Sequence, residues 1–582
     1  MADFTDANWN RPFIRFFKML EVDRKDISYL YIYAIFNGLI NLTLPLGIQA
    51  IIALIAVGQI STSWVILVVG VTIAIPMAGW LQIVQITITE ALKQRIFTRA
   101  SFEFAYRIPR IKLEEIFKHG HYAPELMNRF FDTLNVQKGI SKILIDFATS
   151  VVQITFALIL LAFYHPFFVF FGIALFLMLF VILRVTMRKG LESSLYESKY
   201  KYKVAHWLEE MARTMGTFKL IGETKLPLEK TNSLVTSYLK YRKKHFRVLI
   251  SQYAYIVVFK TVITAGLLIL GSVLVVQREI NIGQFVASEI IVIIIMNSVE
   301  KLILSMETIY DVLTGVEKIG TVTDLPLDRE EKGIPFEQVD RKDGGMSIKI
   351  NQLTHNFPNT AVSSLQEVNL EIEAGEKICV SGYSGSGKTT LLHLVGGLYE
   401  DFEGTIAYND VPFRDLDVVS LRAAIGDNLA REELFEGSIE ENIVVGRPSV
   451  TTQALLNVVN SIGLGDYIRS LPNGFSTFIE PEGRKIPAST VSKIILARSI
   501  ISNPRLLIME EEFSTLERND KICISELLTD RERPWTLLAI SHDPDFAKLC
   551  DRVIIMDKGK VIDTGTFDEI SQKDYYNAIF HA

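Results

Sequence analysis

Apolar and charged residues are distributed unevenly along this chain. The runs Ile27–Thr89 and Phe147–Leu183 contain no Asp, Glu, Lys or Arg. A helix needs about 20 mostly apolar residues to cross a bilayer. Each run is therefore long enough for two membrane spans joined by a tight link. We predict these links at Gly58–Ser63 and at His165-Pro166.

A third pair of apolar segments follows at Val248–Val276 and Ile282–Asp311, which brings the predicted spans to six. The alternative is a set of buried helices in a large soluble protein. That alternative is weak, because core helices of this length seldom lack a charged face.

Basic residues indicate the orientation of the spans. Lys and Arg are frequent between spans two and three and between spans four and five, whereas the opposite loops carry almost none except Arg278. The positive-inside rule then places both long loops and both chain ends in the cytoplasm. The long loops continue the flanking helical patterns, with turns at Gly120–Ala123 and Gly222–Pro227. Residues Arg11–Leu20 have a one-sided apolar face that suits a short interfacial helix.

The character of the chain changes after the last span. We predict a cytoplasmic segment with the interfacial helix at 1–26, a helical transmembrane domain at 27–317, a charged linker at 318–345 and a soluble α/β domain at 346–582. The α/β domain is recognised by short apolar strands that alternate with helical stretches. These strands are expected at Ile378–Ser381, Leu506–Met509, Leu537–Ile540 and Arg552–Met556.

The strongest chemical signal follows the first of these strands. The sequence from Gly382 to Thr390 fits G-x-x-x-x-G-K-[ST] and leads into a helix. In such a loop the backbone N–H groups cradle phosphates, Lys388 neutralises the β- and γ-phosphates, and the Thr389 hydroxyl binds Mg²⁺. The candidate nucleotide-binding residues are Gly382, Ser384, Gly385, Ser386, Gly387, Lys388, Thr389 and Thr390.

Two later strand ends add candidate chemistry. Glu510 and Glu511 follow a buried strand, where the first carboxylate can hold Mg²⁺ and the second can activate water. His542 follows another strand and is a candidate sensor of the γ-phosphate. Read alone, each signal is weak, because Glu runs are usually solvated and a single His is more often structural. Their position after a phosphate-binding loop favours the functional reading.

Six spans, two long cytoplasmic loops, a linker and a phosphate-binding loop domain, in that order, resemble an ABC exporter half-transporter with its transmembrane domain fused to its nucleotide-binding domain. The membrane half looks most like the type I secretion and peptide-export branch. The resemblance implies ATP and Mg²⁺ as ligands, a dimer through the nucleotide domains and secretion accessory proteins as further partners. It also implies a multi-pass protein of the cytoplasmic (inner) membrane.

The resemblance assigns further positions. Phe357 falls where an aromatic side chain stacks on adenine, Glu511 where the catalytic carboxylate stands, and His542 where the switch histidine stands. Glu510 replaces the family's Asp as a metal ligand, together with Thr389. The family's Gln is replaced by Ala430, and the LSGGQ signature reads Ile486-Pro487-Ala488-Ser489-Thr490.

These departures predict an impaired nucleotide site. In this family, ATP lies between the phosphate-binding loop of one chain and the signature of the other. Pro487 removes a hydroxyl and an N–H, and Ala488 and Ser489 add side chains where the backbone approaches the phosphate. We therefore expect an exporter subunit that binds MgATP in a homodimer or beside a motif-complete partner. The alternatives are a non-hydrolysing regulatory subunit and an ATP-gated channel or receptor-like protein.

Composition narrows the partners and the compartment. Hydrophobic residues make up 49% of the 582 residues, and the mean hydropathy is +0.26. The net charge of −6 gives no electrostatic case for nucleic-acid binding. The 3 cysteines are too few for a disulfide framework and fit free cytosolic thiols.

Glu289 and Lys260 are intramembrane candidates, the former as a cavity carboxylate and the latter as a snorkelling side chain. The sequence contains no recognisable motif for a transported substrate.

Overall fold

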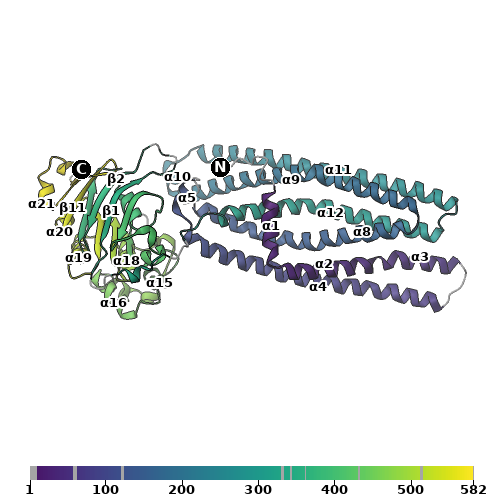
Figure 1. Ribbon diagram of the computed structural model, residues 1–582, viewed down its shortest axis with the longest axis horizontal. Helices are drawn as coiled ribbons and strands as arrows, with labels where there is room; N and C mark the ends of the chain where they lie inside the picture. The colour runs from purple at the N-terminus through teal and green to yellow at the C-terminus, as the bar shows by residue number, and fades with distance from the viewer. Residues whose placement is uncertain are drawn as a thin grey trace. The chain divides into compact units, whose positions relative to one another are not determined.

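The computed structural model describes residues 10–56, 62–118, 123–329, 333–340, 344–358, 360, 362–429, 433–510 and 516–580 (Figure 1). The chain forms two compact units. The first, called the membrane unit, contains residues 10–109 and 123–325. The second, called the nucleotide unit, contains residues 110–118 and the chain from Pro326 onward. Each unit is described by itself.

The membrane unit is entirely helical in its described part. Its helices are α1 (Arg11–Glu21), α2 (Arg24–Asn41), α3 (Thr43–Ala56), α4 (Thr62–Arg107), α6 (Ala123–Met127), α7 (Asp132–Ser141), α8 (Ala148–Ala162), α9 (Pro166–Arg213), α10 (Met215–Ile221), α11 (Leu226–Val276) and α12 (Ile282–Thr323). Among the described residues, six helical segments are long and apolar enough to cross a membrane, which confirms the predicted number of spans. The predicted link at 58–63 falls largely outside the described residues.

Local sequence signals account for several helix boundaries. His165 lies at the N-cap of α9 and accepts a hydrogen bond from the Phe167 N–H, while Pro166 takes the first helical position, where a missing N–H costs nothing. Asn281 and Gln284 form a capping box at the start of α12. Helices α4, α9 and α11 continue far beyond the length of a bilayer span, as the helical pattern of the long loops predicts.

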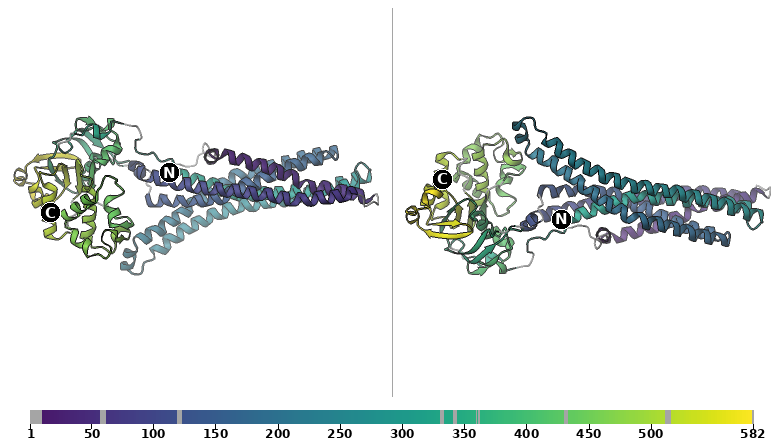
Figure 2. Two further views of the ribbon diagram at one scale, coloured as in Figure 1. Left: turned by 90° about the horizontal axis from the view of Figure 1, so that it is seen from below. Right: turned by 90° about the horizontal axis from the view of Figure 1, so that it is seen from above.

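Helix α12 lies at the centre of the membrane unit. Its Ile291, Ile295 and Val299 are fully buried, and it packs on α3, α7, α8, α9 and α11. Helices α9 and α11 run side by side and diverge from the other helices toward the end that carries α10 (Figures 1 and 2). Apolar helices of this kind associate by close side-chain packing, because the lipid is as apolar as the helix surface.

The two intramembrane candidates differ in their surroundings. Lys260 of α11 donates to Glu300 of α12 at 2.6 Å, so it forms an ion pair within the unit. The sequence did not predict this partner, and the snorkelling of Lys260 stays a prediction. The paired carboxylate lowers the cost of leaving an ammonium among apolar helices. Glu289 lies on the exposed side of α12.

The nucleotide unit contains two main sheets. The strands are β1 (Ile348–His355), β2 (Leu365–Ile372), β3 (Lys377–Gly382), β4 (Glu403–Tyr408), β5 (Val411–Pro412), β6 (Ile425–Asn428), β7 (Gly437–Ser438), β8 (Phe478–Ile479), β9 (Leu506–Glu510), β10 (Thr536–Ile540), β11 (Arg552–Asp557) and β12 (Lys560–Gly565). The larger sheet has the order β12-β11-β3-β10-β9-β6, and a smaller antiparallel sheet has the order β2-β1-β4-β5. All four predicted strands are present, as β3, β9, β10 and β11.

Helices of the nucleotide unit complete its layers. They are α5 (Leu113–Lys118), α13 (Lys388–Val395), α14 (Val418–Ala423), α15 (Ile439–Val444), α16 (Thr452–Ser461), α17 (Gly465–Ser470), α18 (Ala488–Ile500), α19 (Arg518–Thr529), α20 (Pro544–Leu549), α21 (Phe567–Ser571) and α22 (Tyr576–Phe580). Strands β3, β9 and β10 are buried on both faces, which explains apolar runs such as Leu506–Met509 and Leu537–Ile540.

A short piece of the first long loop packs within the nucleotide unit. Ile111 pairs with Leu327 in a β-bridge, and Lys112 forms an ion pair with Glu400 at 3.0 Å. Residues 110–118 of this loop therefore belong to the nucleotide unit, although they precede the last membrane spans in the sequence.

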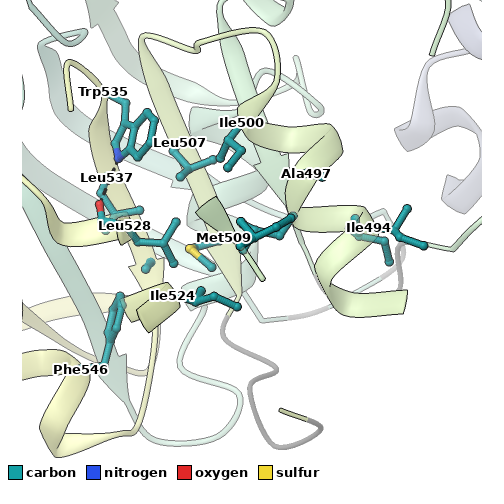
Figure 3. Packing of buried hydrophobic residues seen from close by; sticks show 14 of the residues in the cluster. Ile494, Ala497, Ile500, Leu507, Met509, Ile524, Leu528, Trp535, Leu537 and Phe546 are labelled. Carbon is teal, nitrogen blue, oxygen red and sulfur yellow. Dashed lines mark hydrogen bonds between the residues drawn. The ribbon is translucent and has the colours of Figure 1, made fainter. Parts of the chain in front are cut away.

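One side of the larger sheet is covered by a well-packed apolar cluster (Figure 3). Trp535, Leu528 and Met509 lie together there, and the indole Nε1–H of Trp535 donates to the Leu528 carbonyl at 3.0 Å. Trp535 is only 2% exposed. The cluster therefore fixes the strands whose ends carry the candidate site.

We expect Trp535→Ala to lower the free energy of unfolding of the nucleotide unit by about 3–5 kcal/mol, because the cavity loses both apolar contacts and a hydrogen bond. The measurement is thermal unfolding of the purified full chain in detergent. The control is Phe478→Ala, since Phe478 is 62% exposed on β8 and its loss should cost less than about 0.5 kcal/mol. Equal losses from the two variants would contradict the assignment of Trp535 to the core.

Candidate nucleotide-binding site

The sheet brings three separate parts of the chain to one edge. Strands β3, β9 and β10 are parallel, with Ile540 in register with both Val380 and Glu510. The loop after β3, the carboxylate that ends β9 and the histidine after β10 therefore meet at the carboxyl ends of the strands. Ligands bind at this edge in open α/β sheets.

The loop after β3 has the geometry of a phosphate cradle. Gly387 adopts φ +98° at the N-cap of α13, and a Cβ there would lie 2.5 Å from the Ser364 carbonyl oxygen. Lys388 is 9% exposed, and its ammonium donates to the Gly382 and Tyr383 carbonyls, both at 2.8 Å. Burial lowers the pKa of Lys388 below its ordinary value, and the Glu510 charge partly offsets this effect. The ammonium is thus held inside the loop that would surround a phosphate.

Thr389 and Glu510 form a pair of hard oxygen donors. The Thr389 hydroxyl donates to Glu510 Oε1 at 3.4 Å. Glu510 Oε2 is buried and has no hydrogen-bond partner among the described residues. A buried carboxylate oxygen without a partner, beside a threonine hydroxyl, matches the ligands that Mg²⁺ prefers. The two residues therefore fit a metal ion held between protein and phosphate.

His542 is held by its Nδ1 atom. This nitrogen lies 3.2 Å from the Ser381 hydroxyl and 3.1 Å from the Ile579 carbonyl oxygen of α22. Burial, followed by the nearby Lys388 charge, keeps the pKa of His542 below its ordinary value. The ring is therefore neutral at pH 7, because a neutral imidazole avoids the desolvation cost of a buried cation.

Phe357 belongs to a group of aromatic rings after β1. Its ring packs edge-on against His355, Tyr399 and Phe117, with ring centroids 4.9, 5.8 and 6.4 Å apart. Phe117 comes from α5, in the part of the first long loop that belongs to the nucleotide unit. Such edge-to-face pairs fix the ring plane of Phe357.

All the predicted nucleotide-binding residues line one cavity of about 1620 Å³. Phe357 contributes one wall, the loop from Gly382 to Thr390 the floor, and Glu510 and His542 lie in the same lining. Sequence reasoning missed other lining residues, including Arg518 and Lys521 of α19 and three residues of α22. No local pattern marks them, because they reach the cavity only through the packing of helices far along the chain.

Several predicted positions cannot be compared with the structure. Glu511 and Ala430 lie outside the described residues. The signature segment is described. Pro487 occupies the N-cap of α18, and its carbonyl accepts from the N–H of Thr490 at 2.9 Å. A Ser or Asp at an N-cap supplies a side-chain acceptor to the helix, which Pro487 does not have.

Each of the two units matches a family model of ABC transporters. Residues 27–299 match the model of the ABC transporter transmembrane region, and residues 365–514 match that of the ABC transporter. The chain belongs to the ABC transporters. Together the two matched regions cover most of the chain, in the order predicted from the sequence.

Two curated relatives show the breadth of the similarity. An ATP-dependent lipid A-core flippase of Syntrophus aciditrophicus is 26% identical over 317 residues, covering 54% of this chain and 51% of that protein. A putative multidrug export ATP-binding/permease protein of Staphylococcus aureus is 28% identical over 243 residues, covering 42% of each chain. The match thus spans about half the length of these relatives or less.

The whole fold has a solved counterpart. The structure of a bacterial Atm1-family ABC exporter with ATP bound superposes with a TM-score of 0.83 over 95% of this ABC transporter chain and 96% of the other. Sequence identity is 17%, so the likeness concerns the fold. The predicted fold class, a helical domain of six spans followed by an α/β nucleotide-binding domain, is confirmed.

Proposed function

We propose that this chain is the membrane subunit of an ABC exporter that binds MgATP and couples it to export across the cytoplasmic membrane, with both chain ends in the cytoplasm. The observation that carries the proposal is the cavity in which Lys388, Thr389 and Glu510 converge. A nucleotide site on a chain with six membrane helices supports transport as its use. The transported substrate is not assigned, and the likeness to the type I secretion and peptide-export branch stays a prediction.

The signature segment supports a dimer with unequal sites. In the exporter architecture that the chain resembles, each ATP is completed by the partner's signature. Pro487 lacks both a hydroxyl and an N–H, so a homodimer of this chain has two weakened contacts to the γ-phosphate. A partner with an intact signature restores that contact opposite Lys388. We therefore favour a heterodimer in which this chain supplies the phosphate-binding loop and Glu511.

The test is phosphate release by the chain reconstituted in nanodiscs. MgATP should raise the melting temperature of the chain alone, whereas the chain alone should release phosphate slowly. Restoring the signature by Pro487→Ser, Ala488→Gly and Ser489→Gly together should raise the rate at least about ten-fold, since one lost oxyanion donor costs about 10²–10³. Adding a half-transporter with an intact signature should have a similar effect.

A control separates hydrolysis from contamination. Glu511→Gln in the restored chain should return phosphate release to the background rate, because it removes the predicted catalytic carboxylate. If the natural chain alone already hydrolyses ATP at the restored rate, the impaired site is refuted. If neither the restored signature nor a partner produces hydrolysis that Glu511 controls, a non-hydrolysing regulatory subunit replaces the exporter proposal.

A further inference from the structure

The C-terminal helix α22 contacts the predicted switch histidine directly. The contact joins Nδ1 of His542 to the carbonyl oxygen of Ile579, at 3.1 Å. The carbonyl lies in the last turn of a short helix, where carbonyl groups have no partner within the helix. It is therefore free to accept a hydrogen bond from another part of the molecule.

The position of this carbonyl is fixed by the packing of α22. Ile579 and Phe580 are 4% and 6% exposed and belong to the apolar cluster beside the larger sheet. The Phe580 ring stacks on Tyr576 at 5.2 Å and meets Phe567 of α21 at 6.1 Å. Just before α22, the Tyr575 hydroxyl donates to Asp563 at 2.6 Å. These contacts hold the Ile579 carbonyl against the imidazole.

The contact selects one tautomer of the histidine. The Ser381 hydroxyl, 3.2 Å from the same nitrogen, can either donate or accept, so it is compatible with both tautomers. A carbonyl oxygen only accepts hydrogen bonds, so the Ile579 contact favours the tautomer with the hydrogen on Nδ1 of His542. In the neutral ring, Nε2 then carries a lone pair and is itself an acceptor. A phosphate oxygen is also an acceptor, so this tautomer has no hydrogen to donate to a γ-phosphate.

We propose that α22 sets the preference of this site between ATP and ADP by holding His542 in a tautomer that does not donate to the γ-phosphate. The proposal rests on the ATP-binding site proposed above and adds a specificity-determining contact to it. With α22 docked, ATP gains no hydrogen bond from the neutral ring. With α22 released, the ring can carry its hydrogen on Nε2 and donate to the γ-phosphate. ADP has no γ-phosphate and is indifferent to the change.

Binding of ATP and of ADP to the full chain in nanodiscs tests this proposal. The measurements are made at pH 8, where His542 is neutral, and with EDTA, so that neither nucleotide is hydrolysed. Deleting residues 576–582 should tighten ATP binding about ten- to 100-fold, as expected for one added hydrogen bond to a charged group, and leave ADP binding within about two-fold. The matched control deletes only residues 581–582 and keeps α22.

Two substitutions of His542 test whether α22 changes the ratio of ATP to ADP affinity through this histidine. In a His542→Ala background, the same deletion should leave the ratio of ATP to ADP affinity unchanged, as a double-mutant cycle requires. His542→Gln places an amide donor near the position of Nε2 without any tautomer, so it should reproduce the gain with α22 intact. An equal effect of the deletion on ATP and ADP, or an undiminished effect in His542→Ala, shows that α22 only stabilises the domain and overturns the proposal.

A direct measurement on the undeleted chain covers the case in which the shortened chain does not fold. Nitrogen-15 spectra of ring-labelled histidine distinguish Nδ1–H from Nε2–H, and His542→Ala identifies the resonance. We expect the Nδ1–H form in the absence of nucleotide. An Nε2–H signal for His542 overturns the proposal, and it does so without bearing on whether the chain binds or hydrolyses ATP.

Discussion

Replacing Lys388 with alanine is expected to weaken ATP binding at least about 100-fold, because the loop loses a buried cation whose contacts to phosphate are charge-assisted. The Lys388 ammonium lies inside the loop, bound to the Gly382 and Tyr383 carbonyls at 2.8 Å. Exchange of these contacts to neutral carbonyls for contacts to anionic phosphate oxygens is the favourable step that the variant loses. The measurement is nucleotide binding to the full chain in nanodiscs.

A second lysine of the same cavity supplies the control. Lys521 lines the cavity but is already paired with Asp543 at 2.5 Å. Lys521→Ala should therefore change ATP affinity less than about three-fold, as an exposed or already paired charge contributes little. Comparable losses from both variants would mean that the overall positive charge of the cavity, rather than the placement of Lys388, drives binding.

The second large effect is expected at Gly382, where β3 passes into the phosphate-binding loop. Gly382 adopts φ +141°, and a Cβ on it would lie 2.1 Å from the carbonyl oxygen of Met556 in the neighbouring strand β11. The obstacle is backbone, so β3 and β11 have to separate. Gly382→Ala should lower the free energy of unfolding of the nucleotide unit by more than about 3 kcal/mol and abolish MgATP binding.

Gly385 in the same loop isolates the cause. It also has a positive φ, +74°, but a Cβ there would meet nothing within 4 Å. Gly385→Ala carries only the left-handed backbone strain of about 1–2 kcal/mol, so its melting temperature should fall much less. The melting temperatures of the two purified variants distinguish left-handed backbone strain from the close approach of β11. Equal decreases would show that backbone strain, not the close approach of β11, governs this loop.

The predictions that held rest on local properties of the sequence. A run without charges such as Ile27–Thr89 identifies membrane helices because a bilayer excludes unpaired charge along any helix within it. The loop from Gly382 to Thr390 could be located because its glycines and Lys388 lie within a few residues of each other, and its role as a phosphate site stays a prediction. Strands such as Leu506–Met509 are visible because both faces are buried, so every residue is apolar.

The contacts that the sequence did not predict join distant residues. Lys260 is paired with Glu300, forty residues later on another helix. Phe117 joins the aromatic group of Phe357, although it lies in a loop of the membrane half of the sequence. Nothing near either residue in the sequence reports its partner, since the partner is chosen by how helices and strands pack.

The sequence by itself determined that this is an ABC transporter subunit with six membrane helices and a nucleotide-binding domain, because hydropathy and a nine-residue loop are read from neighbouring residues. Tertiary structure alone decided how the site is held. The carboxyl ends of three parallel strands bring Lys388, Glu510 and His542 to one edge, and the packing of α22 places the Ile579 carbonyl on the imidazole. The physical reason is that the tautomer of a histidine depends on the atom opposite Nδ1, and that atom lies 37 residues away.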